Sequence, residues 1–455
     1  MNHAIGFLSA AALCAAISAG AEPIDGQIDT SFGNQGTRTL SFTYPGTNYD
    51  YAHSVMVDSN GKIVVVGTAT SGNTFDGFVT IARLLPNGQP DATFGSNGQL
   101  VLDIAPGATY GISHALLDAK DRVLLIGSKI NVALNHGEPL VCRVSTNGSL
   151  DPTYGAAGTG CITVPFVNSA GAEFNGGALD ADGALIAVGD NTMTGTTQYR
   201  GTFVKIGATG VVDSSFAGIG GVGFGCGAAM GCIMLNAAVG KDGRIVGAGY
   251  VMTSATTSQF EIIALTPQGA LDTAFNGVGG VSYGFMLTPT DETDQAGGVA
   301  IGPDGRIAAV GYAGVSAQSV AQAAIVEFAA DGTLDFAAPL NLGSASAQVS
   351  VAETAIYAQD GKLMVGGVTV VTATSGLSAA VVRLTAQGQV DTDFGNGFGA
   401  LVQYNSLFHS DTIAAMAFQG TQLLIAGEAA TDTPISAVEA VARLTSDTVF
   451  ANGFE

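Results

Sequence analysis

The hydrophobic and polar positions of this chain repeat with a period of roughly 60 residues, and self-similarity at a fixed period indicates a repeat architecture. A polar turn, most often Asp-Gly or Asn-Gly, precedes an apolar run that ends in glycine, as in Asn60-Gly61-Lys-Ile-Val-Val-Val-Gly67. The glycines that close this phrase are almost evenly spaced, at Gly67, Gly127, Gly189, Gly249, Gly311, Gly367 and Gly427. The chain therefore contains seven copies of one unit.

Each unit carries the pattern of four short strands, which in the first unit lie at residues 52–57, 62–68, 78–85 and 99–104. Asn-Gly and Asp-Gly favour a tight hairpin between the first two strands, because these residues accept a positive φ. The second strand is apolar almost throughout, so we expect it to be buried on both faces. Such sheets must stack, and a radial arrangement leaves only short edges. The sequence predicts an all-β fold, a seven-bladed β-propeller of four-stranded blades.

The two ends of the chain predict how this propeller closes. Only five residues follow Phe450, too few for an outer strand in the last unit. Residues 36–42 form a strand pattern that no inner strand precedes. We therefore expect this N-terminal strand to complete the blade that residues 413–444 begin.

A second phrase, Asp-x-x-aromatic, runs in step with the first. Its aspartates are Asp29, Asp91, Asp151, Asp213, Asp272, Asp391 and Asp447, and a degenerate copy stands at Asp335-Phe336. These carboxylates could be ligands or acids around a ring, but a catalytic group is needed once and this one recurs. We expect each carboxylate to cap its own turn by accepting backbone N–H bonds, while the aromatic ring packs between neighbouring blades.

The two phrases together carry a family resemblance. Asp391-Thr-Asp-Phe-Gly-Asn-Gly and Asp360-Gly-Lys-Leu-Met-Val-Gly-Gly367, recurring in phase along the chain, resemble the delta-60 repeat of bacterial exported and surface proteins. The resemblance covers about residues 25–455 and departs from the pattern at Asp335-Phe336-Ala-Ala, where the glycines are missing. It implies a β-propeller and export, and it implies no general activity.

The N-terminus predicts export. Residues 4–19 are apolar, and Ala19-x-Ala21 fits the cleavage pattern of a secretory signal. We therefore predict a signal peptide at residues 1–21 and one propeller domain at residues 22–455, secreted or periplasmic. Lipid attachment at Cys14 is the alternative, but Leu13 precedes it where that chemistry needs a small residue. No other segment is long and apolar enough to span a membrane.

Four cysteines remain after the predicted cleavage: Cys142, Cys161, Cys226 and Cys232. An even number in an exported chain predicts two disulfides. We expect local pairs, because one pair of cysteines flanks a single turn and the other encloses a short glycine-rich loop. A metal site or a catalytic thiol is the alternative, and it would require a nearby histidine.

The charge limits the partners. The chain has 15 Lys and Arg against 37 Asp and Glu, a formal net charge of −22. This charge repels nucleic acid and anionic membrane surfaces, so we expect neither as a partner. Cationic proteins, divalent metals and neutral polymers such as glycans remain open.

One acidic loop is a candidate metal site. Asp291, Glu292 and Asp294 could hold Ca²⁺, which takes six to eight oxygen ligands. A solvated acidic loop is the alternative, and no other cofactor is expected. The spacing from His53 to His114 is one position longer than the local repeat from Gly67 to Gly127, so we expect the histidine side chains to face differently and to share no metal.

One glycine run imitates a nucleotide-binding motif. The residues from Gly218 to Gly223 match Gly-x-Gly-x-x-Gly letter for letter. That motif binds a pyrophosphate only where a strand enters a helix, and no helical pattern follows here. We expect the match to arise by chance in a glycine-rich repeat.

Two functions remain open from the sequence. The first is a non-catalytic exported propeller that presents loops to a protein or polymer. The second is a propeller-type enzyme, such as a glycan hydrolase or lyase, with acids at the channel mouth. The absence of Trp and of any standard catalytic signature favours the first.

Overall fold

The computed structural model describes residues 25–44, 48–71, 77–105, 109–131, 136–156, 158–166, 169–226, 230–287, 293–315, 320–343, 349–370, 376–397, 399–404, 410–430 and 437–446. Within these ranges every element is a β-strand except one 3-10 turn, Phe216–Gly218. The predicted signal peptide and Asp447 lie outside the described residues. The all-β prediction is confirmed.

The strands form antiparallel groups of four, each in chain order. Group 1 is β2 (Asn48–Val57), β3 (Ile63–Ser71), β4 (Gly77–Leu84) and β5 (Gln99–Leu102); group 2 is β6 (Tyr110–Leu117), β7 (Val123–Asn131), β8 (His136–Val144) and β9 (Cys161–Thr163); group 3 is β10 (Ser169–Leu179), β11 (Leu185–Met193), β12 (Tyr199–Ile206) and β13 (Gly221–Phe224). Group 4 is β14 (Cys232–Val239), β15 (Ile245–Met252), β16 (Ser258–Leu265) and β17 (Gly280–Tyr283); group 5 is β18 (Gln295–Ile301), β19 (Ile307–Val315), β20 (Val320–Phe328) and β21 (Leu334–Pro339). Group 6 is β22 (Val349–Tyr357), β23 (Leu363–Val370), β24 (Ser378–Leu384) and β25 (Ala400–Val402).

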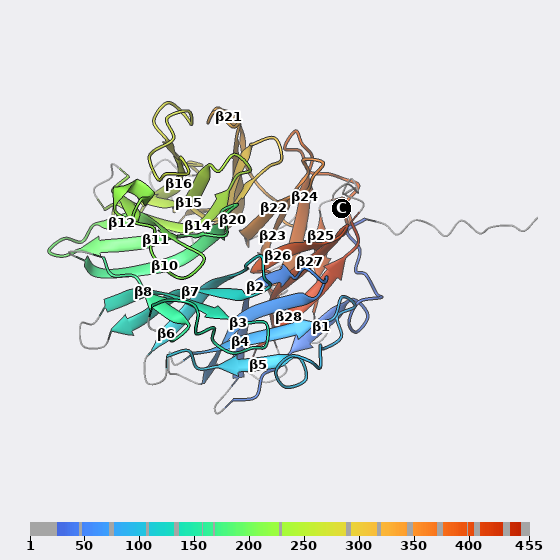
Figure 1. Cartoon of the computed structure of the whole chain (residues 1–455). Helices are drawn as coiled ribbons and strands as arrows, with labels where there is room; N and C mark the ends of the chain where they lie inside the picture. Colours follow the sequence, from blue (N-terminus) through green and yellow to red (C-terminus); the bar gives the residue numbers. More distant parts are fainter. Residues whose placement is uncertain are drawn as a thin grey trace, which may run out of the picture.

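The last group takes its outer strand from the other end of the chain. Group 7 consists of β26 (Ala415–Gln419), β27 (Gln422–Ala430) and β28 (Ala437–Leu444), and β1 (Thr37–Leu40) pairs antiparallel with β28. Groups 7 and 1 belong to one eight-stranded sheet, but a single parallel pair, Tyr49 with Ala437, joins β2 to β28. In Figure 1 the blue strand β1 lies beside the red strand β28.

Apolar clusters hold consecutive groups together. The second strands are buried on both faces as predicted, and Ile63, Val65 and Val66 are all 0% exposed. In the described residues there are seven such clusters, one between each pair of consecutive groups and one between groups 7 and 1. The first strands of consecutive groups also contact one another, and β2 contacts β26. Each sheet therefore buries two faces against its neighbours, as stacking requires.

Asp-x-x-aromatic turns cap one end of groups 1, 2, 3, 4 and 6. Asp91 accepts a hydrogen bond from the Thr93 N–H at 3.1 Å through one oxygen, and its other oxygen pairs with Arg83 at 2.7 Å and Lys62 at 2.8 Å. The Arg83 guanidinium lies 4.5 Å from the centre of the Phe94 ring. Burial alone would raise the pKa of Asp91, but these hydrogen bonds hold it well below its usual value. The predicted capping role is confirmed, and the arginine completes it.

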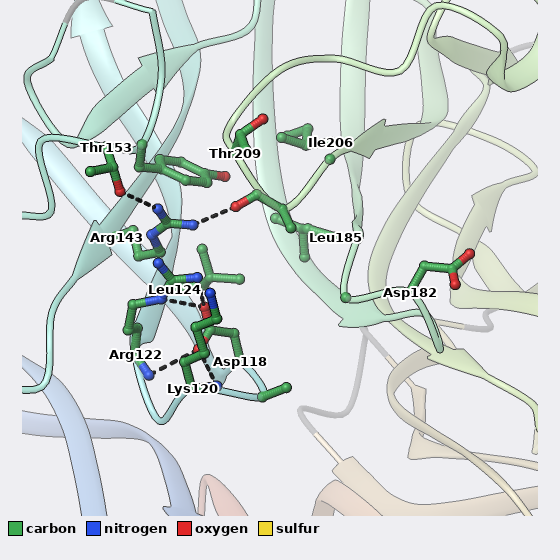
Figure 2. Close-up of a pocket in the computed structure, with 15 residues that line it drawn as sticks. Asp118, Lys120, Arg122, Leu124, Arg143, Thr153, Asp182, Leu185, Ile206 and Thr209 are labelled. Atoms are coloured by element: carbon green, nitrogen blue, oxygen red, sulfur yellow. Dashed lines mark hydrogen bonds and ion pairs between the residues drawn. The ribbon is translucent and has the colours of Figure 1, made fainter.

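The same clamp recurs along the chain. Arg143 pairs with Asp151 and lies over Tyr154, and Arg383 pairs with Asp391 and lies over Phe394. Figure 2 shows the copy between groups 2 and 3, where Arg143 reaches toward Thr153 on one side and toward the loop of Thr209 on the other. We call the end of the strand groups that carries these clamps and the Asp-Gly turns the turn end, and the opposite end the loop end.

One copy of the clamp joins the two ends of the chain. Asp29 pairs with Arg443 at 2.8 Å, although the residues are 414 positions apart, and both side chains are about nine-tenths buried. Arg443 also lies 4.9 Å from the centre of the Phe32 ring. The segment that carries Asp29 therefore has the same position relative to β28 as the Asp91 turn has relative to β4.

Replacing Arg443 with Met should lower the free energy of unfolding by about 3 kcal/mol, because it leaves a buried carboxylate without its cation. Asp29→Asn should also destabilise, and the double variant should show a coupling above about 1 kcal/mol, since both changes remove one contact. The measurement is denaturant unfolding of the three variants. Arg200→Met removes an exposed arginine and is the control. Additive effects of the two changes would contradict the clamp.

Candidate functional site

A β-bulge interrupts the first strand of six groups at the same position. The bulged residues are His53, Ser113, Asn175, Leu235, Gly297 and Glu353. The bulge presses the first strand against the closing glycine of the repeat: a Cβ on Gly189 would collide with the carbonyl oxygen of Glu173. The repeated glycine is therefore required by the bulge, and the bulge turns one residue of each group away from the sheet.

The bulged residues surround a central cavity of about 350 Å³. Its lining comes from all seven groups: His53, Ser113, His114, Asn175, Leu235, Asn236, Gly297, Glu353, Val368, Thr412, Ile413 and Ala414. We call this cavity the central channel. The residue types differ from group to group, so the repeat supplies the frame while the channel surface is unique.

Both channel histidines are neutral at neutral pH. His53 Nε2 lies 3.0 Å from Thr68 Oγ1. Burial lowers the pKa of each imidazole to about 4, and the charge of His53 contributes to the lowering at His114. The expectation that the two would face differently is wrong, because the bulge at Ser113 brings the residue after it to the channel as well. Within the described ranges no three His, Cys, Asp or Glu residues are placed to hold a metal.

Acidic side chains gather at the loop end of the channel in group 3. Asp190 directly follows a closing glycine, and it lies opposite Glu173 in the strand register. Burial and, to a smaller extent, the charge of Glu173 raise the pKa of Asp190 to about 6, although a hydrogen bond from Asn175 opposes the rise. Glu173 itself is exposed. Two carboxyl groups thus face each other across adjacent strands.

Tyrosines extend this surface through groups 4 and 5. Tyr250 and Tyr312 follow the closing glycines of their groups and are half-buried. Burial raises the pKa of both, with contributions from Asp190 at Tyr250 and from Glu353 at Tyr312. Glu353 is accessible from the channel, yet the surrounding protein desolvates it and raises its pKa. We call Glu173, Asp190, Tyr250, Tyr312 and Glu353 the mouth cluster.

The cations lie away from this cluster. Of the 15 lysines and arginines, 12 belong to the turn end: Lys62, Arg83, Lys120, Arg122, Arg143, Lys205, Lys241, Arg244, Arg306, Lys362, Arg383 and Arg443. Of the other three, Arg38 lies on β1, and Lys129 and Arg200 lie near the loop end. The channel mouth therefore carries a negative potential, which favours cationic or neutral ligands over anions.

A second cavity, of about 370 Å³, lies at the turn end between groups 2 and 3. Its arginines are already engaged. Arg122 pairs with Asp118 at 2.7 Å (Figure 2). Asp151 pairs with Arg122 at 3.1 Å and with Arg143 at 2.8 Å. These cations maintain the clamp, so this cavity is a weaker candidate than the central channel.

The acidic loop predicted to hold Ca²⁺ is described only at Asp294. Asp291 and Glu292 lie outside the described residues. Asp294 is 0% exposed, and its carboxylate accepts backbone N–H bonds from Phe285 at 2.8 Å and Gly314 at 3.2 Å. This carboxylate anchors the incoming loop, and calcium binding here stays a prediction.

Two other groups use a buried aspartate in the same way. Asp50 accepts the Phe42 N–H at 3.2 Å, and Asp411 accepts the Tyr404 N–H at 3.3 Å. Like Asp294, each stands at the start of its group and fixes the segment that leads into it. Burial raises the pKa of Asp50 to about 6 and that of Asp411 to about 7.

Both predicted disulfides are confirmed. Cys142 is bonded to Cys161, its register partner on the neighbouring strand, and Cys226 is bonded to Cys232, the first residue of β14. The first bond joins the outer two strands of group 2. Such bonds form in oxidising compartments.

The sequence of the repeat matches a family model described as "Domain of unknown function (DUF5122) beta-propeller" at residues 59–94, 240–275, 302–335 and 358–394. The matches support a β-propeller repeat family. Each match runs from an Asp-Gly or Asn-Gly turn to an Asp-x-x-aromatic phrase or its degenerate copy, so the family model covers the same unit as the two phrases. The finer delta-60 name stays a prediction.

Solved structures with similarity to this chain include three that act on polysaccharides by their titles. An ulvan lyase of polysaccharide lyase family PL25 has a TM-score of 0.48 at 10% identity, covering 90% of this chain and 96% of the lyase. The α-L-arabinanase of Penicillium chrysogenum has a TM-score of 0.43 at 10% identity, covering 89% and 97%. The GH74 xyloglucanase of Xanthomonas campestris has a TM-score of 0.44 at 13% identity, covering 88% and 55%. At these scores no substrate or chemistry transfers to this chain.

No curated protein sequence matches the chain. In the part of the chain that the structure describes, no helix is long and apolar enough to cross a membrane.

Acidification from pH 7.5 to 5.5 should raise the melting temperature by several degrees. Carboxyl groups with raised pKa values bind protons more tightly when folded, so their contribution to stability is complete at low pH and is lost as pH rises through about 6 to 7. These groups are Asp50, Asp190, Glu261, Asp411 and Glu439. The lowered pKa values of His53 and His114 have the opposite effect, because their contribution to stability is lost as pH falls below 6.5. These two histidines are outnumbered by the five carboxyl groups.

The measurement is thermal unfolding at both pH values for the wild type and for Asp411→Asn, which cannot titrate at that position. The variant should show a smaller rise than the wild type. A melting temperature that falls on acidification in the wild type would contradict the burial of these carboxyl groups.

Proposed function

We propose that the protein is an exported, non-catalytic seven-bladed β-propeller, closed by its N-terminal strand, that binds a protein or a neutral polymer at the mouth of its central channel. The observation that carries this proposal is the mouth cluster. Its residues lie on the repeated strand groups, but their combination of side chains occurs once in the described structure. Each strand group corresponds to one blade.

Several contacts support the count and the closure. The four-stranded groups follow one another in chain order, apolar clusters fill the spaces between them, and one such cluster lies between groups 7 and 1. The pairing of β1 with β28 and the clamp of Arg443 on Asp29 give the last group the same outer strand and turn as the others. A ring arranged in this way leaves no long sheet edge open.

The chemistry of the mouth favours a hydroxyl-rich neutral polymer among the possible ligands. Tyr250 and Tyr312 offer flat rings with a polar tip, which suit stacking against sugar rings and hydrogen bonding to them. The carboxyl groups of Glu173, Asp190 and Glu353 accept hydrogen bonds from hydroxyl or ammonium donors. The distance of the cations from the channel makes an anionic polymer a poor fit.

Two sequence features support export: the predicted signal peptide and the four cysteines, which are paired in the folded chain.

A second candidate function rests on Glu173 and Asp190. Residues directly opposite in antiparallel strands have Cβ atoms roughly 4.5–5.5 Å apart, and two carboxyl groups in different environments can act as acid and base. Asp190, with a pKa of about 6, would be the acid, and the exposed Glu173 would be the second carboxylate. This pair could serve a glycan hydrolase, which uses two such groups on either side of the scissile bond.

Neutral polysaccharides and candidate proteins should bind the mature chain, and Tyr250→Ala and Tyr312→Ala should each weaken that binding at least tenfold. The ring provides contact area that no other group replaces. The measurement is calorimetric titration with a panel of neutral glycans and proteins, with Tyr283→Ala on β17, away from the channel, as the matched control within twofold of the wild type.

The same samples decide between the two functions. Binding without release of reducing ends or unsaturated products supports the binding module. If products form, and if product formation disappears in both Asp190→Asn and Glu173→Gln while binding is retained, the protein is an enzyme and not a binding module. Equal binding by the wild type and both tyrosine variants would contradict the mouth as the site.

A further inference from the structure

A separate cavity of about 530 Å³ opens between groups 2 and 3, away from the residues of the central channel. On one side it is lined by the segment after β9, with Val164, Pro165 and Phe166. On the other side lies one face of β11, β12 and β13, with Asn191, Thr202 and Gly223 among its residues. We call this cavity the outer groove. Its walls are mainly apolar, so it suits an apolar body with few polar groups.

Two polar atoms in the groove have no hydrogen-bond partner. Asn191 is 6% exposed and Thr202 is 1% exposed. The Oδ1 atom of Asn191 and the Oγ1 atom of Thr202 are both buried without a partner in the described structure. Buried polar atoms are normally paired, because burying one alone costs free energy. Two such atoms in the lining of one cavity indicate a ligand that would satisfy them.

In the two other groups with a polar side chain at the equivalent position, groups 1 and 4, the protein itself satisfies it. In group 4, Glu261 accepts a hydrogen bond of 2.5 Å from Ser282, its partner on the outer strand. In group 1, Thr80 donates to Glu439 of group 7. In group 3 the partner of Thr202 on the outer strand is Gly223, which has no side chain. The missing side chain leaves Thr202 unpaired and leaves the groove open at the same place.

The glycine run that imitates a nucleotide-binding motif lies along this groove. Gly218 belongs to the 3-10 turn, and Gly220, Gly221 and Gly223 line the groove. A Cβ on Gly223 would meet only ordinary contacts, the closest being Arg200 Cβ at 3.6 Å. The backbone therefore does not require glycine here, in contrast to the closing glycines of the repeat.

A cation stands beside the two unpaired atoms. Arg200 lines the groove, is exposed, and lies opposite Asn191 in the strand register. It forms no ion pair within the described part of the chain, and the acidic loop end holds few other cations. A carboxylate on the ligand would complement it.

We propose that the outer groove binds a small amphiphilic acid that carries an amide, of the N-acyl amino acid class. The apolar acyl chain lies against Val164 and Phe166. The amide N–H donates to Asn191 Oδ1, the amide carbonyl accepts from the Thr202 hydroxyl, and the carboxylate pairs with Arg200. This site is independent of the channel mouth, and its ligand is an anion, which the mouth disfavours.

The test is calorimetric titration of the mature protein with N-hexanoylglycine, N-octanoylglycine and N-benzoylglycine. At least one should bind with saturation at one site per chain. Gly223→Ser places at this position the side chain that Ser282 provides in group 4, so it should satisfy Thr202, narrow the groove and weaken binding at least tenfold. Gly225→Ser is the matched control, because a Cβ there meets no atom within 4 Å, and its affinity should stay within twofold.

Two further variants assign the polar contacts. Thr202→Val should weaken N-hexanoylglycine about tenfold while leaving hexanoate unchanged. Arg200→Gln should weaken N-hexanoylglycine but not its carboxamide. The proposal is overturned if none of the three acids binds, if Gly223→Ser binds as the wild type does, or if Thr202→Val and Arg200→Gln do not separate these ligand pairs. Melting temperatures equal to that of the wild type would show that the variants are folded.

Discussion

The contact between Arg443 and Asp29 joins the two ends of the chain and attaches the N-terminal segment to the last strand group. A four-stranded sheet with two apolar faces is not stable alone, so each group needs a neighbour on both sides. Consecutive groups provide this along the chain, but groups 7 and 1 meet only through residues far apart in sequence. The Arg443–Asp29 ion pair, the packing of Arg443 on the Phe32 ring and the pairing of β1 with β28 provide the contacts between the two ends of the chain. Because buried charges are costly when unpaired, removing either partner should destabilise this junction.

The frame then creates its own functional surface through the bulges. Each bulge leaves no room for a side chain at the glycine opposite it, so this glycine recurs in every repeat. The bulge also turns one residue of the first strand toward the channel, and the type of this residue differs from repeat to repeat. The same strand position is therefore histidine in group 1, asparagine in group 3 and glutamate in group 6. Both proposed binding surfaces, the mouth cluster and the outer groove at Gly223, lie where the residues depart from the repeat.

Much of the fold could be predicted from the sequence, because the period, the Asp-Gly turns and the apolar second strands are local signals. The disulfides and the capping aspartates followed from spacing. The arginine of the clamp was missed, although Arg83, Arg143 and Arg383 each stand eight residues before their aspartate. The channel site was not predictable, because a bulge shifts the strand register by one residue without a side-chain pattern, which is why the histidines were assigned to different faces. The bonds that Asp294 accepts from the Phe285 and Gly314 N–H groups were not predictable either, because they join segments whose contact the sequence pattern does not reveal.

The N-terminal segment forms part of the last strand group, and one measurement tests its importance directly. Thermal unfolding of the mature chain should be compared with that of a chain that begins at residue 43 and so lacks Asp29, Phe32 and β1. The shortened chain should lose its single cooperative transition, because group 7 then has an open edge and Arg443 has lost Asp29. An unchanged melting temperature and an equally cooperative transition would contradict this prediction.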